Sequence, residues 1–124
     1  MYIASLIITH KNAPKEMLDN ISMIERETHE FYKDLLNNSD ITEALVLQTC
    51  NRFEIYFSGK QEDVGIKQAT MSMTKKFGKT VKLYIEIKRH IEVIDHLFRV
   101  VSSIDSLIIG ENQIQFQVKS TYKF

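Results

Sequence analysis

The chain has 124 residues, which is the size of one ordinary domain, and its 44% hydrophobic content is enough to form a core without metal or disulfide support. Lys and Arg number 16, as do Asp and Glu, so the net charge does not indicate a polyanionic partner or a membrane surface. No apolar run approaches the roughly 20 residues that span a bilayer, and no charged and then apolar leader opens the chain. We therefore expect a soluble, cytoplasmic protein.

The first half of the chain predicts three strands and one helix. Residues 2–9 are rich in β-branched and aromatic types and predict a strand. Pro14 suits the first turn of a helix, and apolar residues then recur at spacings of three and four as far as Leu36. Two further strands are expected at 43–48 and 53–58, separated by a short junction.

The second half adds a helix at 62–77, which Gly78 stops, and a fourth strand at 81–87. The order β-α-β-β-α-β predicts the α+β class, with a ferredoxin-like antiparallel sheet and both helices on one face. Additional C-terminal helices are expected at 90–101 and 111–122. Because no cap, Gly or Pro follows the last of them, we expect the chain to be part of a longer protein.

Cys50 is the single cysteine, so it forms no intrachain disulfide, and this fits a reducing compartment. It lies at the tip between two predicted strands, where a thiol is reachable. Arg52 is the nearest group that could stabilise a thiolate. Free cysteines are also among the most buried residues, so composition leaves open both a reactive thiol and a core residue.

Arg52 and His96 are the other candidates for chemistry. The planar guanidinium of Arg52 matches a carboxylate in a bidentate manner, although Glu54 could instead hold it in a surface ion pair. His96 is a candidate acid or base on an amphipathic helix, where a histidine can equally be a boundary residue. The scattered histidines give no metal-ligand spacing, and the four glycines form no nucleotide-binding loop.

Four segments together resemble the glutamyl-tRNA reductase family, in the order in which that family has them. Residues 9–14 (THKNAP) resemble its H-K-x-A-P element, and residues 49–56 (TCNRFEIY) resemble its [ST]-C-N-R-x-E-[IV]-Y signature. Residues 96–100 (HLFRV) and 105–119 resemble its H-L-F-R-V, D-S and G-E-x-Q-I-x-x-Q-V-K segments. The second and fourth segments together make the resemblance specific.

The resemblance implies NADPH-dependent reduction of glutamyl-tRNA to glutamate-1-semialdehyde, the entry step of tetrapyrrole (porphyrin) biosynthesis. A thiolate at Cys50 would attack the ester carbonyl, expel the tRNA and leave a glutamyl thioester, which accepts hydride more readily than an ester. His96 matches the family's active-site histidine, for which proton transfer and substrate orientation both stay open. Arg52 is expected to bind the side-chain carboxylate of the glutamyl group.

The resemblance also implies the rest of the site. The substrate-binding residues expected from it are Thr49, Arg52, Ser106, Glu111 and Gln113, and the residues expected to support them are Asn51 and Glu54.

Family members continue into an NADPH-binding domain and a helical dimerisation domain, and neither fits in 124 residues. We therefore expect residues 1–89 to form a ferredoxin-like substrate-binding and catalytic subdomain. Residues 90–124 would be a helical extension that completes the active site and leads to the cofactor domain. NADPH would bind outside this chain, so reduction by the chain alone is not expected. The resemblance further implies a homodimer and a downstream aminomutase partner.

Two alternatives of other classes stay open. A non-catalytic RNA-binding module fits the eight basic against three acidic residues between positions 60 and 90. That alternative predicts a glycine and a basic residue among the aromatics of a central strand, and residues 53–57 lack both. The second alternative is a ligand-sensing ferredoxin-like module in which Cys50 is inert packing.

Overall fold

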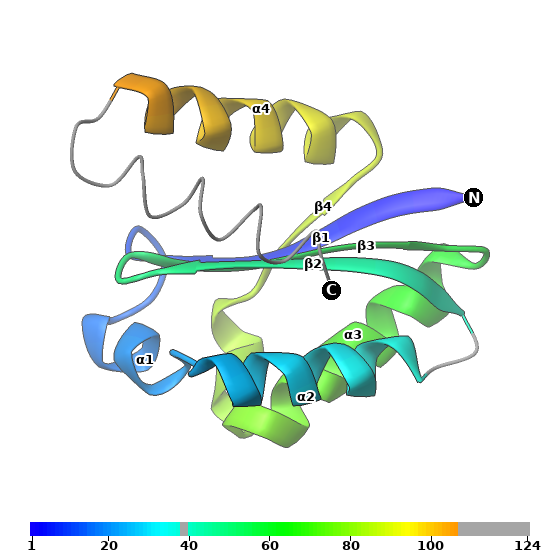
Figure 1. Ribbon diagram of the computed structural model, residues 1–124, viewed down its shortest axis with the longest axis horizontal. Helices are drawn as coiled ribbons and strands as arrows, with labels where there is room; N and C mark the ends of the chain where they lie inside the picture. The colour runs from blue at the N-terminus through cyan, green and yellow to red at the C-terminus, as the bar shows by residue number, and fades with distance from the viewer. Residues whose placement is uncertain (38–39, 107–124) are drawn as a thin grey trace.

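The computed structural model describes residues 1–37 and 40–106 (Figure 1). Its strands are β1 (Tyr2–Thr9), β2 (Ile41–Thr49), β3 (Arg52–Gly59) and β4 (Glu86–Arg89). Its helices are α1 (Lys15–Asn20), α2 (Glu25–Leu36), α3 (Glu62–Phe77) and α4 (Ile91–Ser106), with a 3₁₀ helix η1 (Lys79–Tyr84). The predicted α+β class is confirmed. None of the helices in the described ranges has both the length and the apolar character that crossing a membrane requires.

The strands form one antiparallel sheet in the order β2-β3-β1-β4. Thr9 of β1 and Thr49 of β2 both pair with Arg52 of β3. Residues directly opposite one another in an antiparallel pair point to the same face. These three side chains therefore form a row across the sheet, at the end where β2 turns into β3.

The two faces of the sheet are covered by different helices. As predicted, α2 and α3 lie on one face, and α4 lies on the other (Figure 1). Strand β3 alternates accordingly, because successive side chains of a strand point to opposite faces. Its apolar residues Phe53, Ile55 and Phe57 belong to the main core, whereas Tyr56 packs with Val93 of α4.

Aromatic packing holds β3 in this orientation. The Phe53 ring meets Phe31 of α2 and Phe77 of α3 edge to face, with centroids 6.2 and 5.4 Å apart. All three rings belong to or pack against the main core. Because Phe53 is fixed on the α2 and α3 side, its neighbours Arg52 and Glu54 must point toward the α4 side.

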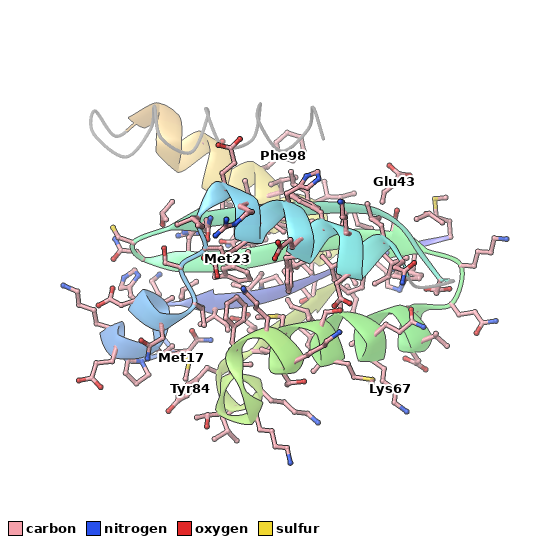
Figure 2. The ribbon with its side chains drawn as sticks, turned by 60° about the horizontal axis from the view of Figure 1, so that its bottom comes forward. Met17, Met23, Glu43, Lys67, Tyr84 and Phe98 are labelled. Carbon is pink, nitrogen blue, oxygen red and sulfur yellow. The ribbon has the colours of Figure 1, made fainter. Side chains whose placement is uncertain are left out.

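The single helix predicted from Pro14 to Leu36 is wrong, because the chain breaks between α1 and α2. Ile21 in the break is buried at 1% exposure, but the spacing of three and four does not continue, because Met23 is buried at 6% exposure while Ile24 is 59% exposed. The Gln48 side chain donates to the Met23 carbonyl over 2.8 Å and accepts from its N–H over 3.0 Å. This double hydrogen bond ties the break to β2, and Figure 2 labels Met23 in the break.

The fourth strand is also shifted from the predicted range 81–87. Residues 79–84 form η1, and β4 begins only at Glu86. Apolar residues alternate in the sequence there, but the tight helical turn buries Val81 fully and leaves Leu83 79% exposed, so the alternation does not correspond to a strand.

Helix α4 confirms the helix expected at 90–101. Val93 and Val100 are buried at 0% and 5% exposure, whereas the apolar residues Ile91 and Phe98 of the same helix are 72% and 68% exposed. The helix therefore has apolar residues on two sides, and periodicity does not decide between them. His96 lies on the packed side. The helix expected at 111–122 is outside the described residues.

Candidate functional site

Cys50 lies in the turn between β2 and β3, and its side chain is exposed. The turn is held on both sides. Its Asn51 carbonyl accepts a hydrogen bond from the N–H of His10 over 2.9 Å, and the N–H of Asn51 donates to the Thr49 hydroxyl over 3.2 Å. The sequence leaves open whether Cys50 is a reactive thiol or a core residue. Because its side chain is exposed, Cys50 is not a core residue and its thiol is reachable.

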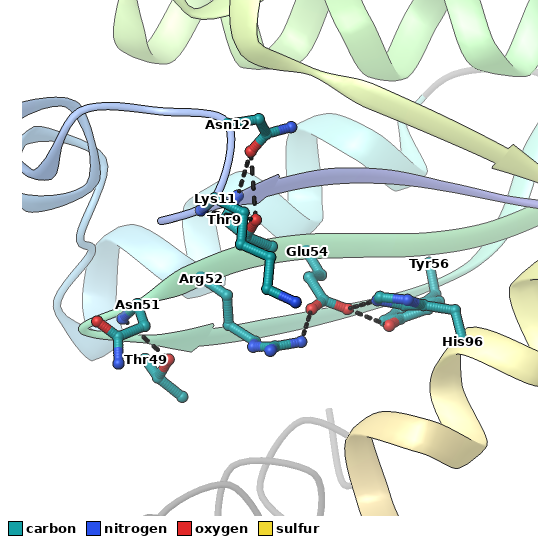
Figure 3. Close-up of polar contacts among 9 residues, drawn as sticks. All are labelled: Thr9, Lys11, Asn12, Thr49, Asn51, Arg52, Glu54, Tyr56 and His96. Atoms are coloured by element: carbon teal, nitrogen blue, oxygen red, sulfur yellow. Dashed lines mark hydrogen bonds and ion pairs between the residues drawn. The ribbon is translucent and has the colours of Figure 1, made fainter. Parts of the chain in front are cut away.

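The loop after β1 lies beside this turn. The Asn12 side chain accepts hydrogen bonds from the N–H and the hydroxyl of Thr9, over 3.0 and 3.3 Å, and folds the loop back on the strand (Figure 3). Thr9 in turn pairs with Arg52 on β3. The segments 9–14 and 49–56, which are distant in sequence, therefore meet at one end of the sheet.

Glu54 is fully buried on the face that α4 covers. Its Oε2 accepts from Nη1 of Arg52 over 2.7 Å, and its Oε1 accepts from the Tyr56 hydroxyl and lies 3.1 Å from Nε2 of His96 (Figure 3). A buried carboxylate needs such partners, because the low-dielectric interior otherwise disfavours its charge. Glu54 thereby links β3 to α4 through His96.

Arg52 keeps a route to solvent, because 25% of its side chain is exposed. A guanidinium has five N–H donors in a fixed fork. Glu54 engages Nη1, and within the described ranges no other acceptor is bonded to the guanidinium. Arg52 can therefore bind a ligand carboxylate while it remains paired with Glu54.

His96 and Cys50 are separated along this face. His96 contacts Glu54, and Arg52 lies between Glu54 and the turn that carries Cys50. Residues two apart on a strand are about 7 Å apart, so Arg52 lies closer to the turn than His96, which contacts Glu54. A catalytic role for His96 stays a prediction.

Residues 6–124 match the family described as the N-terminal domain of glutamyl-tRNA(Glu) reductase. The chain belongs to this family. It is 34% identical to the glutamyl-tRNA reductase of Trichormus variabilis, over 99% of this chain and 29% of that protein. It is 33% identical to that of Syntrophobacter fumaroxidans, over 98% of this chain and 27% of that protein. The chain thus spans less than a third of the length of these relatives.

A solved structure is similar over the same region. The glutamyl-tRNA reductase from Methanopyrus kandleri superimposes with a TM-score of 0.62 and is 30% identical, over 98% of this chain and 27% of that one. The fold and the family resemblance found in the sequence therefore agree.

Sequence reasoning missed Tyr56 as a residue of this reductase-domain site. Its hydroxyl is buried against Glu54, and burial, followed by the Glu54 charge, raises the pKa of Tyr56 far above its ordinary value. The alternation of Arg52, Glu54 and Tyr56 on one face of a predicted strand was the signal that could have found it. The periodicity of the strand could not predict which helix covers this face.

Three of the expected substrate contacts cannot be placed. The side chains of Ser106, Glu111 and Gln113 lie outside the described part of the reductase domain. In the residues that are described, no group of three or more His, Cys, Asp or Glu side chains could hold a metal ion.

The glycines of the described residues do not form a phosphate-binding loop for a dinucleotide. Phosphate-binding loops need clustered glycines whose backbone a phosphate can approach. Instead, a Cβ atom on Gly59 would lie 2.3 Å from the Asp40 carbonyl, and one on Gly65 would lie 1.6 Å from the Tyr2 hydroxyl. These two glycines permit tight packing inside the protein. Gly78, with φ of 99°, stands alone at the end of α3.

Proposed function

We propose that this domain binds the glutamyl group of glutamyl-tRNA and transfers it to Cys50, as the acyl-transfer part of the reduction of glutamyl-tRNA to glutamate-1-semialdehyde in tetrapyrrole synthesis. One observation carries the proposal: an exposed thiol at Cys50 lies two residues from the partly exposed guanidinium of Arg52, at one end of the sheet. The proteins that the chain resembles are named glutamyl-tRNA reductases, which supports this substrate.

In the proposed step, the Cys50 thiolate attacks the carbonyl carbon of the ester. A carbon–sulfur bond forms, the bond to the terminal ribose oxygen breaks, and that oxygen takes up a proton as the tRNA leaves. Arg52 binds the side-chain carboxylate of the glutamyl group and so holds the carbonyl beside the turn. His96 supplies the proton or orients the substrate, and the polar contacts are assigned to Thr49, Ser106, Glu111 and Gln113.

Glu54 has a supporting role in this proposal. It anchors Nη1 of Arg52 from the buried side, so the guanidinium presents its remaining donors toward solvent. Asn51 supports the turn through its backbone contacts with Thr49 and His10. Neither residue needs to touch the reacting atoms.

For the whole reductase we propose NADPH as hydride donor, a homodimer, a downstream aminomutase partner and a cytoplasmic location. The glycines in the described residues form no phosphate-binding loop, and we assign no reduction step to this chain. We further propose that residues 1–89 are a ferredoxin-like substrate-binding and catalytic subdomain and that 90–124 complete its site. The interleaved strand order β2-β3-β1-β4 supports the ferredoxin-like assignment.

The test is incubation of the chain with tRNA charged with radioactive glutamate, in the absence of cofactor. The unmodified chain should free the tRNA and retain glutamate in a hydroxylamine-sensitive bond, whereas Cys50→Ser should do neither. Because Cys50 is exposed, the variant should keep its thermal stability, and Met71→Ser, exposed on α3, is the matched control. Equal release by the unmodified chain and Cys50→Ser would rule out the nucleophile. An RNA-binding module would hold the tRNA with its glutamate intact.

A further inference from the structure

The contacts of Glu54 determine which nitrogen of His96 carries a hydrogen. Glu54 is fully buried, and Arg52, a cation that only donates, lies 2.7 Å from its Oε2. In this ion pair Glu54 is the carboxylate partner, and a carboxylate can only accept hydrogen bonds. Every group around Glu54 must then be a donor.

The other two partners meet at the second oxygen, Oε1. Tyr56 keeps its proton, because burial and the neighbouring charge of Glu54 disfavour the phenolate, so its hydroxyl donates. Nε2 of His96 lies 3.1 Å from the same oxygen. This oxygen carries no hydrogen, so Nε2 cannot accept a hydrogen bond from it. Nε2 must therefore carry a hydrogen, and in the neutral ring the lone pair is on Nδ1.

We propose that Glu54 fixes His96 in the Nε2–H tautomer, so that Nδ1 is the nitrogen that exchanges a proton during acyl transfer. Glu54 is then a positioning residue that acts through His96. The tautomer is a property of the folded chain, and only the exchange step rests on the proposed function. In that step, Nδ1 first takes up a proton from solvent and then gives it to the departing ribose oxygen as the carbon–oxygen bond breaks, which returns the ring to the neutral Nε2–H tautomer.

The charged groups around His96 are consistent with this assignment. The β3 side contributes Glu54 and, beyond it, Arg52. On α4 itself, Asp95 and Arg99 pair with each other over 2.9 Å at the exposed side of the helix. Among the described residues, Glu54 is thus the acceptor that contacts the His96 ring, which is 19% exposed.

Glu54→Gln should reverse the tautomer. Arg52 can only donate, so the carbonyl oxygen of the introduced amide turns toward it, and the NH₂ group turns toward Tyr56 and His96. The Tyr56 hydroxyl can accept one of these hydrogens. Nε2 of His96 must accept the other, which moves the ring hydrogen to Nδ1. The substitution preserves size, so it tests the hydrogen-bond pattern and not the packing.

Tyr56→Phe is the matched control. It removes one hydrogen bond from the same buried oxygen but keeps the carboxylate, so His96 should remain the Nε2–H tautomer. If loosening of the network alone changed the ring, both variants would change it. The pair therefore separates an effect of the acceptor from a general structural effect.

The experiment is a long-range ¹H–¹⁵N correlation spectrum of the ¹⁵N-labelled chain, at a pH where the imidazoles are neutral, with His96 assigned through His96→Asn. In the unmodified chain we expect Nε2 to resonate as a protonated nitrogen and Nδ1 as an unprotonated one. In Glu54→Gln the two nitrogens should swap these states, and in Tyr56→Phe they should keep them. A protonated Nδ1 in the unmodified chain would overturn the proposal, even where Glu54→Gln does not fold. So would an equal change in both variants.

The exchange step has its own readout. At saturating glutamyl-tRNA, Glu54→Gln should lower the rate of glutamate release about 100-fold, the lower range of a lost general acid. Alkylation of Cys50 by iodoacetamide should keep its rate, because the carbonyl oxygen of the introduced amide still accepts from Arg52. Release that depends on Cys50 but not on Glu54 would sink the exchange step and leave the proposed function intact. A loss of both the glutamate-release rate and the alkylation rate in Glu54→Gln would show that Glu54 only maintains the structure.

Discussion

Arg52 points Nη1 at Oε2 of Glu54, 2.7 Å away, and keeps a quarter of its side chain exposed beside the Cys50 turn. Arg52→Lys preserves the charge but not the fork, and one ammonium cannot hold Glu54 and a ligand carboxylate in the same geometry. A hydrogen bond to a charged group contributes about 1.5 to 3 kcal/mol, so we expect the KM for glutamyl-tRNA to rise about tenfold or more. Glutamate release measured against tRNA concentration tests this. Arg26→Lys, exposed on α2, is the control, and an equal KM in both variants contradicts the assignment.

Cys50 should react with iodoacetamide at neutral pH in the folded state, and mass spectrometry can follow the reaction because the chain has one cysteine. Arg52→Gln removes the cation two residues along the chain from Cys50 and should slow alkylation about fivefold. That factor corresponds to about 1 kcal/mol, the attraction between unit charges about 4 Å apart in water. Alkylation that occurs only after unfolding would show that the thiol is unreactive, and an unchanged rate in Arg52→Gln would remove Arg52 as its partner.

The arrangement along β3 could be predicted from the sequence, because a strand has a strict period of two. Phe53, Ile55 and Phe57 face the core, and Glu54 pairs with Arg52, both as the pattern indicates. The same logic failed at 81–87, where apolar residues alternate in the sequence but Val81 is buried from a 3₁₀ turn and Leu83 is exposed. An alternating sequence does not by itself specify a strand.

The contact between Glu54 and His96 could not be predicted. The two residues are 42 positions apart, and their meeting depends on which side of α4 packs on the sheet. Apolar residues occur on both sides of that helix, and the exposed Phe98 is larger than the buried Val93. Local periodicity gives each helix a face, but the choice between two faces is made by the shape of the surface it meets.

Asp40 should contribute to a loss of stability in acid. It accepts a hydrogen bond from the Tyr2 hydroxyl over 2.7 Å, and this bond, followed by those from the N–H groups of Gln61 and Lys60, lowers its pKa. The unfolded chain therefore binds the proton more readily, so this stabilisation is present above the unfolded pKa of about 3.9 and is lost as the pH falls through the lower folded value.

Urea unfolding of Asp40→Asn tests this effect. The variant should be less stable than the unmodified chain at pH 7, and the difference should shrink as the pH falls below about 4. Asp19→Asn, exposed on α1, should follow the unmodified chain throughout. A difference that is the same at every pH would mean that Asp40 acts through packing and not through its charge.

Gly65→Ala should destabilise the fold although alanine is the better helix former by about 1 kcal/mol. The added Cβ would lie 1.6 Å from the Tyr2 hydroxyl and 2.6 Å from Cζ of the same ring, and Tyr2 is buried with its ring edge against Phe57. Either α3 shifts or Tyr2 leaves its bond to Asp40, and overpacking of this kind costs about 1 to 3 kcal/mol. We therefore expect a lower melting temperature for Gly65→Ala, while Lys67→Ala, exposed on the same helix, stays near the unmodified value. In a Tyr2→Phe background the loss should be smaller, because the closest clashing atom is gone. A Gly65→Ala chain more stable than the unmodified one would show that helix propensity outweighs the contact with Tyr2.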